Sequence, residues 1–142
     1  MGKLRAELLR GDRKVGVWGT GYIGFSTMAN FAVNGVACIG TDIVQSVVDT
    51  INAGRVPIPN LEYWLGFEVE SLVRSGMLRA TTRWQDLIES QVAVHMVAVP
   101  TEKDDEPWDD ALIDVTRKIA TVADHKTHDA PLIIIESTLT PN

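Results

Sequence analysis

The stretch that decides the fold is KVGVWGTGYIG, residues 14–24. Its first five residues form a β-prone run, and Gly19, Gly21 and Gly24 follow at the spacing G-x-G-x-x-G. In a strand–loop–helix turn, the first glycine permits a tight turn, the second lets a pyrophosphate approach the backbone, and the third lets the helix pack closely on the strand. The stretch therefore predicts a dinucleotide-binding turn, with the N–H groups of the following helix directed at the phosphates.

Strands and helices alternate along the rest of the chain. The predicted strands cover residues 14–18, 36–40, 78–81, 92–99 and 131–135, and the predicted helices cover 3–10, 22–34, 44–53, 61–75, 84–90 and 109–124. The last two strands are continuously apolar, which is typical of parallel strands buried on both faces. We therefore predict an α/β fold with a doubly wound parallel sheet, a Rossmann-type NAD-binding domain over residues 14–142 preceded by an N-terminal helical extension over residues 1–13.

An acidic residue follows the second predicted strand. Asp42 lies about 20 residues beyond the glycine turn, where a carboxylate accepts hydrogen bonds from the hydroxyls of the adenine ribose. Its negative charge would repel a 2′-phosphate, and no arginine stands beside it, so the sequence favours NAD over NADP. A helix N-cap is the alternative role for Asp42.

The amino-acid composition of the chain limits the kinds of partner that it can bind. The net charge of −6 and the sequence pI of about 4.9 disfavour nucleic acid, which usually requires a basic face. No apolar stretch reaches the roughly 18 residues that a membrane span needs. The single cysteine, Cys38, lies in an apolar run and is predicted to be a buried thiol, and the cytoplasm is the expected location.

Metal binding is not predicted. His125 and His128 stand three residues apart between two aspartates, but no third cluster of ligands supports them, and a solvated turn is the preferred interpretation. The acidic tract from Glu102 to Asp110 lacks the spacing of a calcium loop and is predicted to be a solvent-exposed loop. His95, within an apolar strand, is interpreted as a core histidine.

Five motifs in order resemble the nucleotide-sugar 6-dehydrogenases, which act on UDP-glucose, UDP-N-acetylmannosamine or GDP-mannose. These motifs are the glycine turn, Gly-Thr-Asp-Ile at 40–43, Ile-Asn-Ala-Gly at 51–54, Val-Pro-Thr at 99–101 and Glu-Ser-Thr at 136–138. The resemblance implies an NAD-dependent, two-step oxidation of the sugar C6 alcohol to a carboxylate through a thioester on a cysteine. It also implies that this cysteine and the sugar-binding parts lie in other domains, that the intact enzyme is a homodimer, and that this chain is the N-terminal NAD-binding domain, inactive alone.

The resemblance also assigns roles to individual residues. The cofactor-binding set that it implies is Gly19, Gly21, Tyr22, Ile23, Gly24, Asp42, Pro100, Thr101 and Ser137. In this assignment the backbone N–H groups of Tyr22 and Ile23 bind the pyrophosphate, Thr101 closes over the cofactor and Ser137 touches NAD. Thr138 is implied to be the catalytic member, since its hydroxyl would help to position a water or a proton. Thr101 as a simple strand terminator is an equal alternative.

The sequence departs from the family pattern at three places. Val47 stands where a basic residue is common, Pro59-Asn60-Leu61 replaces the start of a Glu-Pro-Gly-Leu stretch, and Glu102 replaces the proline after Val-Pro-Thr. These departures leave the subfamily and the sugar open. The sequence leaves two alternative functions: a stand-alone NAD-binding module, and another Rossmann dehydrogenase of the 6-phosphogluconate or 3-hydroxyacyl type.

Overall fold

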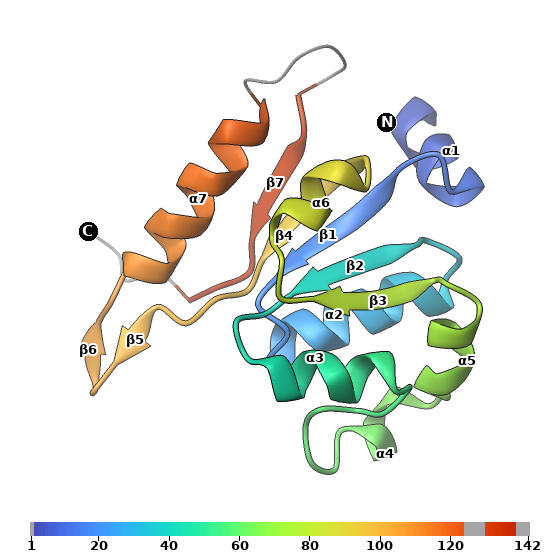
Figure 1. The fold of residues 1–142 in the computed structure, drawn as a ribbon, viewed down its shortest axis with the longest axis horizontal. Coiled ribbons are helices and arrows are strands. Elements are labelled where there is room, and N and C mark those ends of the chain that lie inside the picture. Colours follow the sequence, from blue (N-terminus) through green and yellow to red (C-terminus); the bar gives the residue numbers. More distant parts are fainter. Residues whose placement is uncertain (1, 124–129, 139–142) are drawn as a thin grey trace.

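A five-stranded parallel sheet forms the centre of the molecule (Figure 1). The computed structural model describes residues 2–123 and 130–138. The strand order is β3-β2-β1-β4-β7, and every neighbouring pair is parallel. The strands are β1 (Lys14–Trp18), β2 (Cys38–Thr41), β3 (Leu78–Thr81), β4 (Val92–Val97) and β7 (Leu132–Ile135).

Helices cover both faces of this sheet, as the doubly wound prediction requires (Figure 1). The helices are α1 (Gly2–Arg10), α2 (Tyr22–Val33), α3 (Gln45–Asn52), α4 (Glu62–Leu65), α5 (Val69–Arg74), α6 (Gln85–Glu89) and α7 (Asp110–Ala123). On one face, α2 packs on β1 and β2, and α3 and α5 pack on β3, through a core that includes Phe25, Met28 and Ile51, all at 0% exposure. On the other face, Leu87 of α6 and Ile119 of α7 form a second core. The fold class predicted from the sequence is confirmed.

The sheet changes its winding direction at β1. From β1 the chain moves outward to β2 and β3, and it then returns to the other side of β1 to form β4 and β7. In open α/β sheets, ligands bind in the crevice at the carboxyl ends of the strands where the order reverses. The glycine turn after β1 and the residues that follow β2, β4 and β7 therefore meet at one edge of the sheet.

Two predicted elements differ in the structure. The helix expected over 61–75 is broken into α4 and α5 because Gly66 adopts φ 73°, a left-handed conformation that ends a helix. The acidic tract after β4 is a short hairpin rather than an irregular loop, with β5 (Glu102–Lys103) paired antiparallel to β6 (Glu106–Pro107). Asp104 and Asp105 both have positive φ, as a two-residue hairpin turn requires.

The prediction that the last strand is buried was wrong. The side chains of Leu132, Ile133, Ile134 and Ile135 are 37–49% exposed. Their apolar sequence gives the right element, but β7 lies at the edge of the sheet and pairs only with β4 within the described residues. Burial depends on what lies beside a strand, which the composition of the strand does not reveal.

The Ile-Asn-Ala-Gly motif joins α3 to the far edge of the sheet. The Asn52 side chain accepts a hydrogen bond from the Ala80 N–H at 2.8 Å and donates one to the Ala80 carbonyl at 2.9 Å. Gly54 follows with φ 75°, and a Cβ there would lie 2.7 Å from the backbone of Glu70. The motif therefore fixes where α3 ends against β3 and α5, and its role in the fold is structural.

A buried tryptophan–histidine pair lies under the carboxyl edge of the sheet. Trp18, at the end of β1, donates its indole N–H to Nδ1 of His95 on β4 at 3.0 Å. Accepting this bond leaves Nε2 as the protonated nitrogen of a neutral imidazole. Burial lowers the pKa of His95 to about 4, with a further contribution from the positive charge of Arg13. His95 is 1% exposed, so the interpretation as a core histidine is confirmed; Cys38 is also buried, and burial raises the pKa of its thiol.

We expect His95 to make stability depend on pH. The folded state holds a neutral imidazole down to a pH of about 4, whereas the unfolded chain takes up the proton near 6.5. The unfolded state therefore binds more protons between these values, and stability falls as the pH falls through this window. Urea unfolding of the wild type and of His95→Gln between pH 7.5 and 4 measures the effect.

The wild type should lose up to about 3 kcal/mol more than the variant over this range, since one unit of pKa shift corresponds to about 1.4 kcal/mol. Comparing the two proteins subtracts the titration of the carboxylates, which both contain. Equal losses would contradict a neutral, buried His95.

Candidate dinucleotide-binding site

The glycine turn is shaped by contacts that exclude a side chain. A Cβ at position 24 would lie 1.9 Å from the carbonyl oxygen of Gly19, and a Cβ at position 19 would lie 2.6 Å from the carbonyl oxygen of Ala98. Gly19 also has φ 85°. By contrast, a Cβ on Gly21 would meet nothing within 4 Å. Gly19 and Gly24 are therefore required by the packing of the protein, whereas Gly21 borders open space that a phosphate can enter.

The N-terminus of α2 faces this space. Its N-cap residue, Gly21, makes no side-chain cap. The first N–H groups of a helix have no partner within the helix, and they carry the positive end of its dipole. Tyr22 and Ile23 begin the helix, and their side chains are 58% and 51% exposed. An anionic group can therefore approach the helix end from solvent without displacing a protein group.

Asp42 is held by hydrogen bonds from both sides. Its Oδ2 accepts the backbone N–H and the hydroxyl of Thr20, each at 2.8 Å, and its Oδ1 accepts the N–H of Val44 at 3.0 Å. The carboxylate therefore links the end of β2 to the glycine turn after β1. The bond to Val44 reaches the N-cap residue of α3, and no side chain caps this helix, so the alternative role of Asp42 as a helix N-cap is wrong. Oδ1 keeps a lone pair for a further donor, whereas Oδ2 already accepts two hydrogen bonds.

Two cavities of about 410 and 420 Å³ flank the glycine turn. Both are lined by Gly19, Asp42, Val99 and Pro100, so they form one groove across the carboxyl ends of the strands. We call the cavity on the side of β2 and β3 the first cavity, and the cavity on the side of β7 the second cavity.

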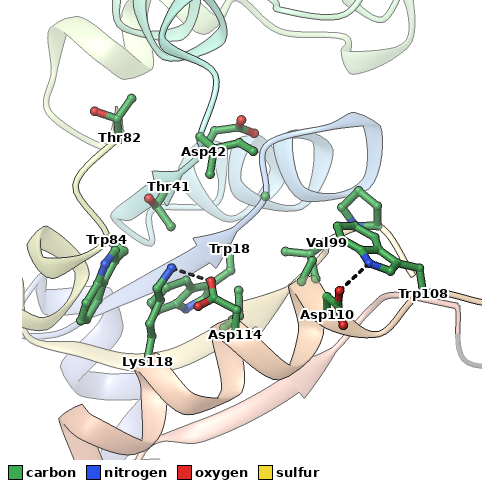
Figure 2. A pocket seen from close by; sticks show the side chains of 15 residues that line it. Trp18, Thr41, Asp42, Thr82, Trp84, Val99, Trp108, Asp110, Asp114 and Lys118 are labelled. Atoms are coloured by element: carbon green, nitrogen blue, oxygen red, sulfur yellow. Dashed lines mark hydrogen bonds and ion pairs between the residues drawn. The ribbon is translucent and has the colours of Figure 1, made fainter. Parts of the chain in front are cut away.

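The first cavity is walled by aromatic and aliphatic side chains (Figure 2). Trp18, Trp84 and Trp108 line it, and Figure 2 shows Trp84 and Trp108 on opposite sides. Its polar side chains are largely paired with one another: Lys118 with Asp114 at 2.5 Å, and the Trp108 indole N–H with Asp110 at 2.9 Å. The space suits a flat, weakly polar ring such as a nucleobase.

Beside Asp42, Ile43 also lines the first cavity, and its side chain is 96% exposed. Burying this exposed aliphatic side chain against an apolar group of a ligand would lower the free energy of the complex.

The second cavity brings the two hydroxyl motifs together. Thr101 follows β4, and Ser137 and Thr138 follow β7; all three line the cavity. The Thr101 hydroxyl donates to the Thr138 carbonyl, and the Ser137 hydroxyl donates to the Val99 carbonyl at 2.6 Å. These bonds tie the two loops together and use the hydroxyl protons, so each of the two oxygens can act only as an acceptor toward a ligand. The Thr138 hydroxyl makes no hydrogen bond within the described part of the chain.

All ten sequence-predicted site residues fall at this one edge of the sheet. Nine of them line the second cavity or its rim, and Gly24 lies behind the turn against Gly19. Sequence reasoning missed Thr20, which orients Asp42, Trp84, which directly precedes α6, and Lys118 of α7. The x position of G-x-G could have signalled Thr20, but no sequence pattern indicates which helix residues reach the first cavity.

The site has no cationic residue at the position where the family commonly has one. Val47 lies on α3 with its side chain packed against the core on the α2 face of the sheet.

In the described residues, no group of three or more His, Cys, Asp or Glu side chains could hold a metal ion. His125 and His128 lie outside the described residues. Nor does any described helix have the length and hydropathy needed to cross a bilayer.

Four features together define a dinucleotide-binding domain. They are a parallel sheet that reverses its order at β1, a glycine turn with no room for a side chain at position 24, an uncapped helix N-terminus and a hydrogen-bonded carboxylate after β2. The sequence model described as "UDP-glucose/GDP-mannose dehydrogenase family, NAD binding domain" matches residues 13–142. The chain therefore belongs to this family and contains its NAD-binding domain. Members of the family are NAD-dependent dehydrogenases.

Individual relatives agree with this placement. The UDP-N-acetyl-D-mannosamine dehydrogenase of Salmonella typhi is 40% identical over 126 residues, which is 87% of this chain and 27% of that protein. The enzyme of the same name from Pyrococcus horikoshii is 35% identical over 90% of this chain and 29% of its own length. The chain thus spans less than a third of the length of these relatives.

Solved structures show the same fold. A ternary complex of GDP-mannose dehydrogenase from Pseudomonas aeruginosa superposes with a TM-score of 0.76 at 25% identity, over 90% of this chain and 29% of that one. The (S)-3-hydroxybutyryl-CoA dehydrogenase of Ralstonia eutropha, at 18% identity over 87% of this chain and 40% of that one, has a TM-score of 0.55 and shares the fold alone.

Thr20→Val should weaken the binding of a dinucleotide by about three- to tenfold. The substitution removes the hydroxyl that holds Oδ2 of Asp42, and a hydrogen bond to a charged group contributes about 1.5–3 kcal/mol, part of which the remaining N–H bond retains. Calorimetric titration with NAD measures the loss. Thr116→Val is the matched control, because its hydroxyl bonds only to a carbonyl within α7. Equal affinities of wild type and Thr20→Val would contradict a tethering role.

Proposed function

We propose that this chain holds NAD along the groove, with the adenine in the first cavity and the nicotinamide in the second. The observation that carries the proposal is the carboxylate of Asp42, fixed beside the glycine turn with a lone pair of Oδ1 free for a ligand. A hydroxyl of the adenine ribose is a matching donor. NADP fits less well, because a 2′-phosphate would meet this negative charge.

The other residues take roles set by their places. Gly21 leaves room for the pyrophosphate, and the N–H groups of Tyr22 and Ile23 bind its oxygens. Pro100, Thr101 and Ser137 border the nicotinamide end, where the two hydroxyl oxygens accept hydrogen bonds from the cofactor. Thr138 carries the free hydroxyl of this region, which suits a group that positions a water or a proton. Bound NAD supplies a hydride acceptor.

We further propose that the intact protein oxidises the C6 alcohol of a UDP- or GDP-linked sugar to a carboxylate, using two NAD. The family membership supports the reaction class. The names of the relatives favour UDP-N-acetyl-D-mannosamine as the sugar nucleotide. The sugar site, the thioester cysteine and the contacts of a homodimer would belong to other domains, so this chain alone should have no dehydrogenase activity.

The stand-alone binding module remains the second candidate. It shares every feature of the groove, and it differs only in lacking a catalytic partner. A 3-hydroxyacyl or 6-phosphogluconate type of dehydrogenase receives no support beyond the fold, because the similarity to a 3-hydroxybutyryl-CoA dehydrogenase is at 18% identity.

Calorimetric titration of the chain with NAD and with NADP tests the proposal. We expect NAD to bind with a micromolar to millimolar dissociation constant, NADP to bind more weakly, and Asp42→Ala to weaken NAD by at least about tenfold, because a charged hydrogen bond to the ribose is lost. Asp49→Ala is the control, an exposed acidic residue on α3 that lines neither cavity. NADP binding as tight as NAD, or no effect of Asp42→Ala, would refute it.

A further inference from the structure

The proposed NAD lies along the groove in one direction, and this direction places the carboxylate of Glu136 at the nicotinamide end. Asp42 follows β2 and marks the adenine ribose, and the glycine turn after β1 marks the pyrophosphate. The far end of the cofactor must therefore lie beyond β1, over the ends of β4 and β7. The inference below rests on the proposed binding of NAD.

Glu136 stands at that end, directly after β7. Its N–H donates to the Val97 carbonyl at 2.8 Å, which fixes its backbone at the end of the sheet. Both of its carboxylate oxygens accept the hydroxyl of Thr27 on α2, at 3.2 and 3.0 Å. Glu136 is half-buried, and it lines the second cavity beside Ser137 and Thr138. The carboxylate is thus held in one place by two elements of the fold.

The negative charge of Glu136 has no cationic partner among the described residues. No Lys or Arg lines the second cavity, and the other carboxylate there, Asp42, lies at the opposite end of it. The elements around Glu136 add no charge either: α2 and β7 contain no charged residue, and the one histidine of β4 is the buried, neutral His95. An uncompensated, oriented carboxylate therefore faces the nicotinamide region.

We propose that Glu136 makes the site prefer the oxidised cofactor. The nicotinamide ring carries a positive charge in NAD and none in NADH, whereas the rest of the two molecules is identical. A fixed negative charge near the ring attracts only the oxidised form, and the partial burial of the carboxylate limits the screening of this attraction by solvent. Glu136 is therefore a specificity-determining residue for the redox state of the cofactor.

The test is the ratio of the dissociation constants of NADH and NAD, measured by calorimetric titration of the 142-residue chain at low ionic strength. Glu136→Gln keeps the size and the acceptor oxygen but removes the charge. It should lower the ratio three- to tenfold, chiefly by weakening NAD. Thr27→Val keeps the charge but releases the carboxylate, and it should lower the ratio by a smaller factor. Raising the salt concentration should lower the ratio of the wild type and not that of Glu136→Gln.

Two controls separate this inference from the proposed function. Glu62→Gln removes an exposed carboxylate from α4, which lines neither cavity, and should leave the ratio unchanged. ADP-ribose lacks the nicotinamide, so its affinity should be the same for the wild type and Glu136→Gln. An unchanged ratio in Glu136→Gln, with normal ADP-ribose binding, would overturn the inference alone. Failure of the wild type to bind both NAD and ADP-ribose would overturn the proposed function and this inference together.

Discussion

The close approach of α2 to the end of β1 is the constraint on which the site depends. The carbonyl oxygen of Gly19 occupies the position that a Cβ at 24 would take, at 1.9 Å, so no other residue fits there without moving the turn. This contact starts α2 directly under the turn and points its open N-terminus along the groove. Asp42 can then reach Thr20, and the ends of β4 and β7 line up on the other side.

The two cavities of the groove present different kinds of surface to a ligand. The first cavity offers tryptophan and aliphatic walls in which polar groups are paired with each other, which suits binding by apolar contact and stacking. The second cavity offers hydroxyl oxygens, the free hydroxyl of Thr138 and the carboxylate of Glu136, which suits orientation and charge recognition. A dinucleotide has the same division, with an adenine at one end and a reactive, charge-changing ring at the other.

Sequence patterns predicted the parts of this arrangement that depend on local geometry. The glycine spacing, the position of Asp42 and the strand 78–81 depend on turns and periodicity within short segments, and the structure has them where they were expected. The exposure of β7 and the tryptophan wall depend on which elements become neighbours, and no short segment carries that information. The break at Gly66 was missed because a glycine within an apolar helical pattern can be tolerated or can end the helix.

The most direct test of the account is a crystal structure of this chain with NAD bound. We expect a hydroxyl of the adenine ribose within hydrogen-bond distance of the Asp42 carboxylate, the pyrophosphate at the N–H groups of Tyr22 and Ile23, and the nicotinamide over the ends of β4 and β7. A cofactor bound in the reverse direction, with its nicotinamide against the tryptophans of the first cavity, would contradict it.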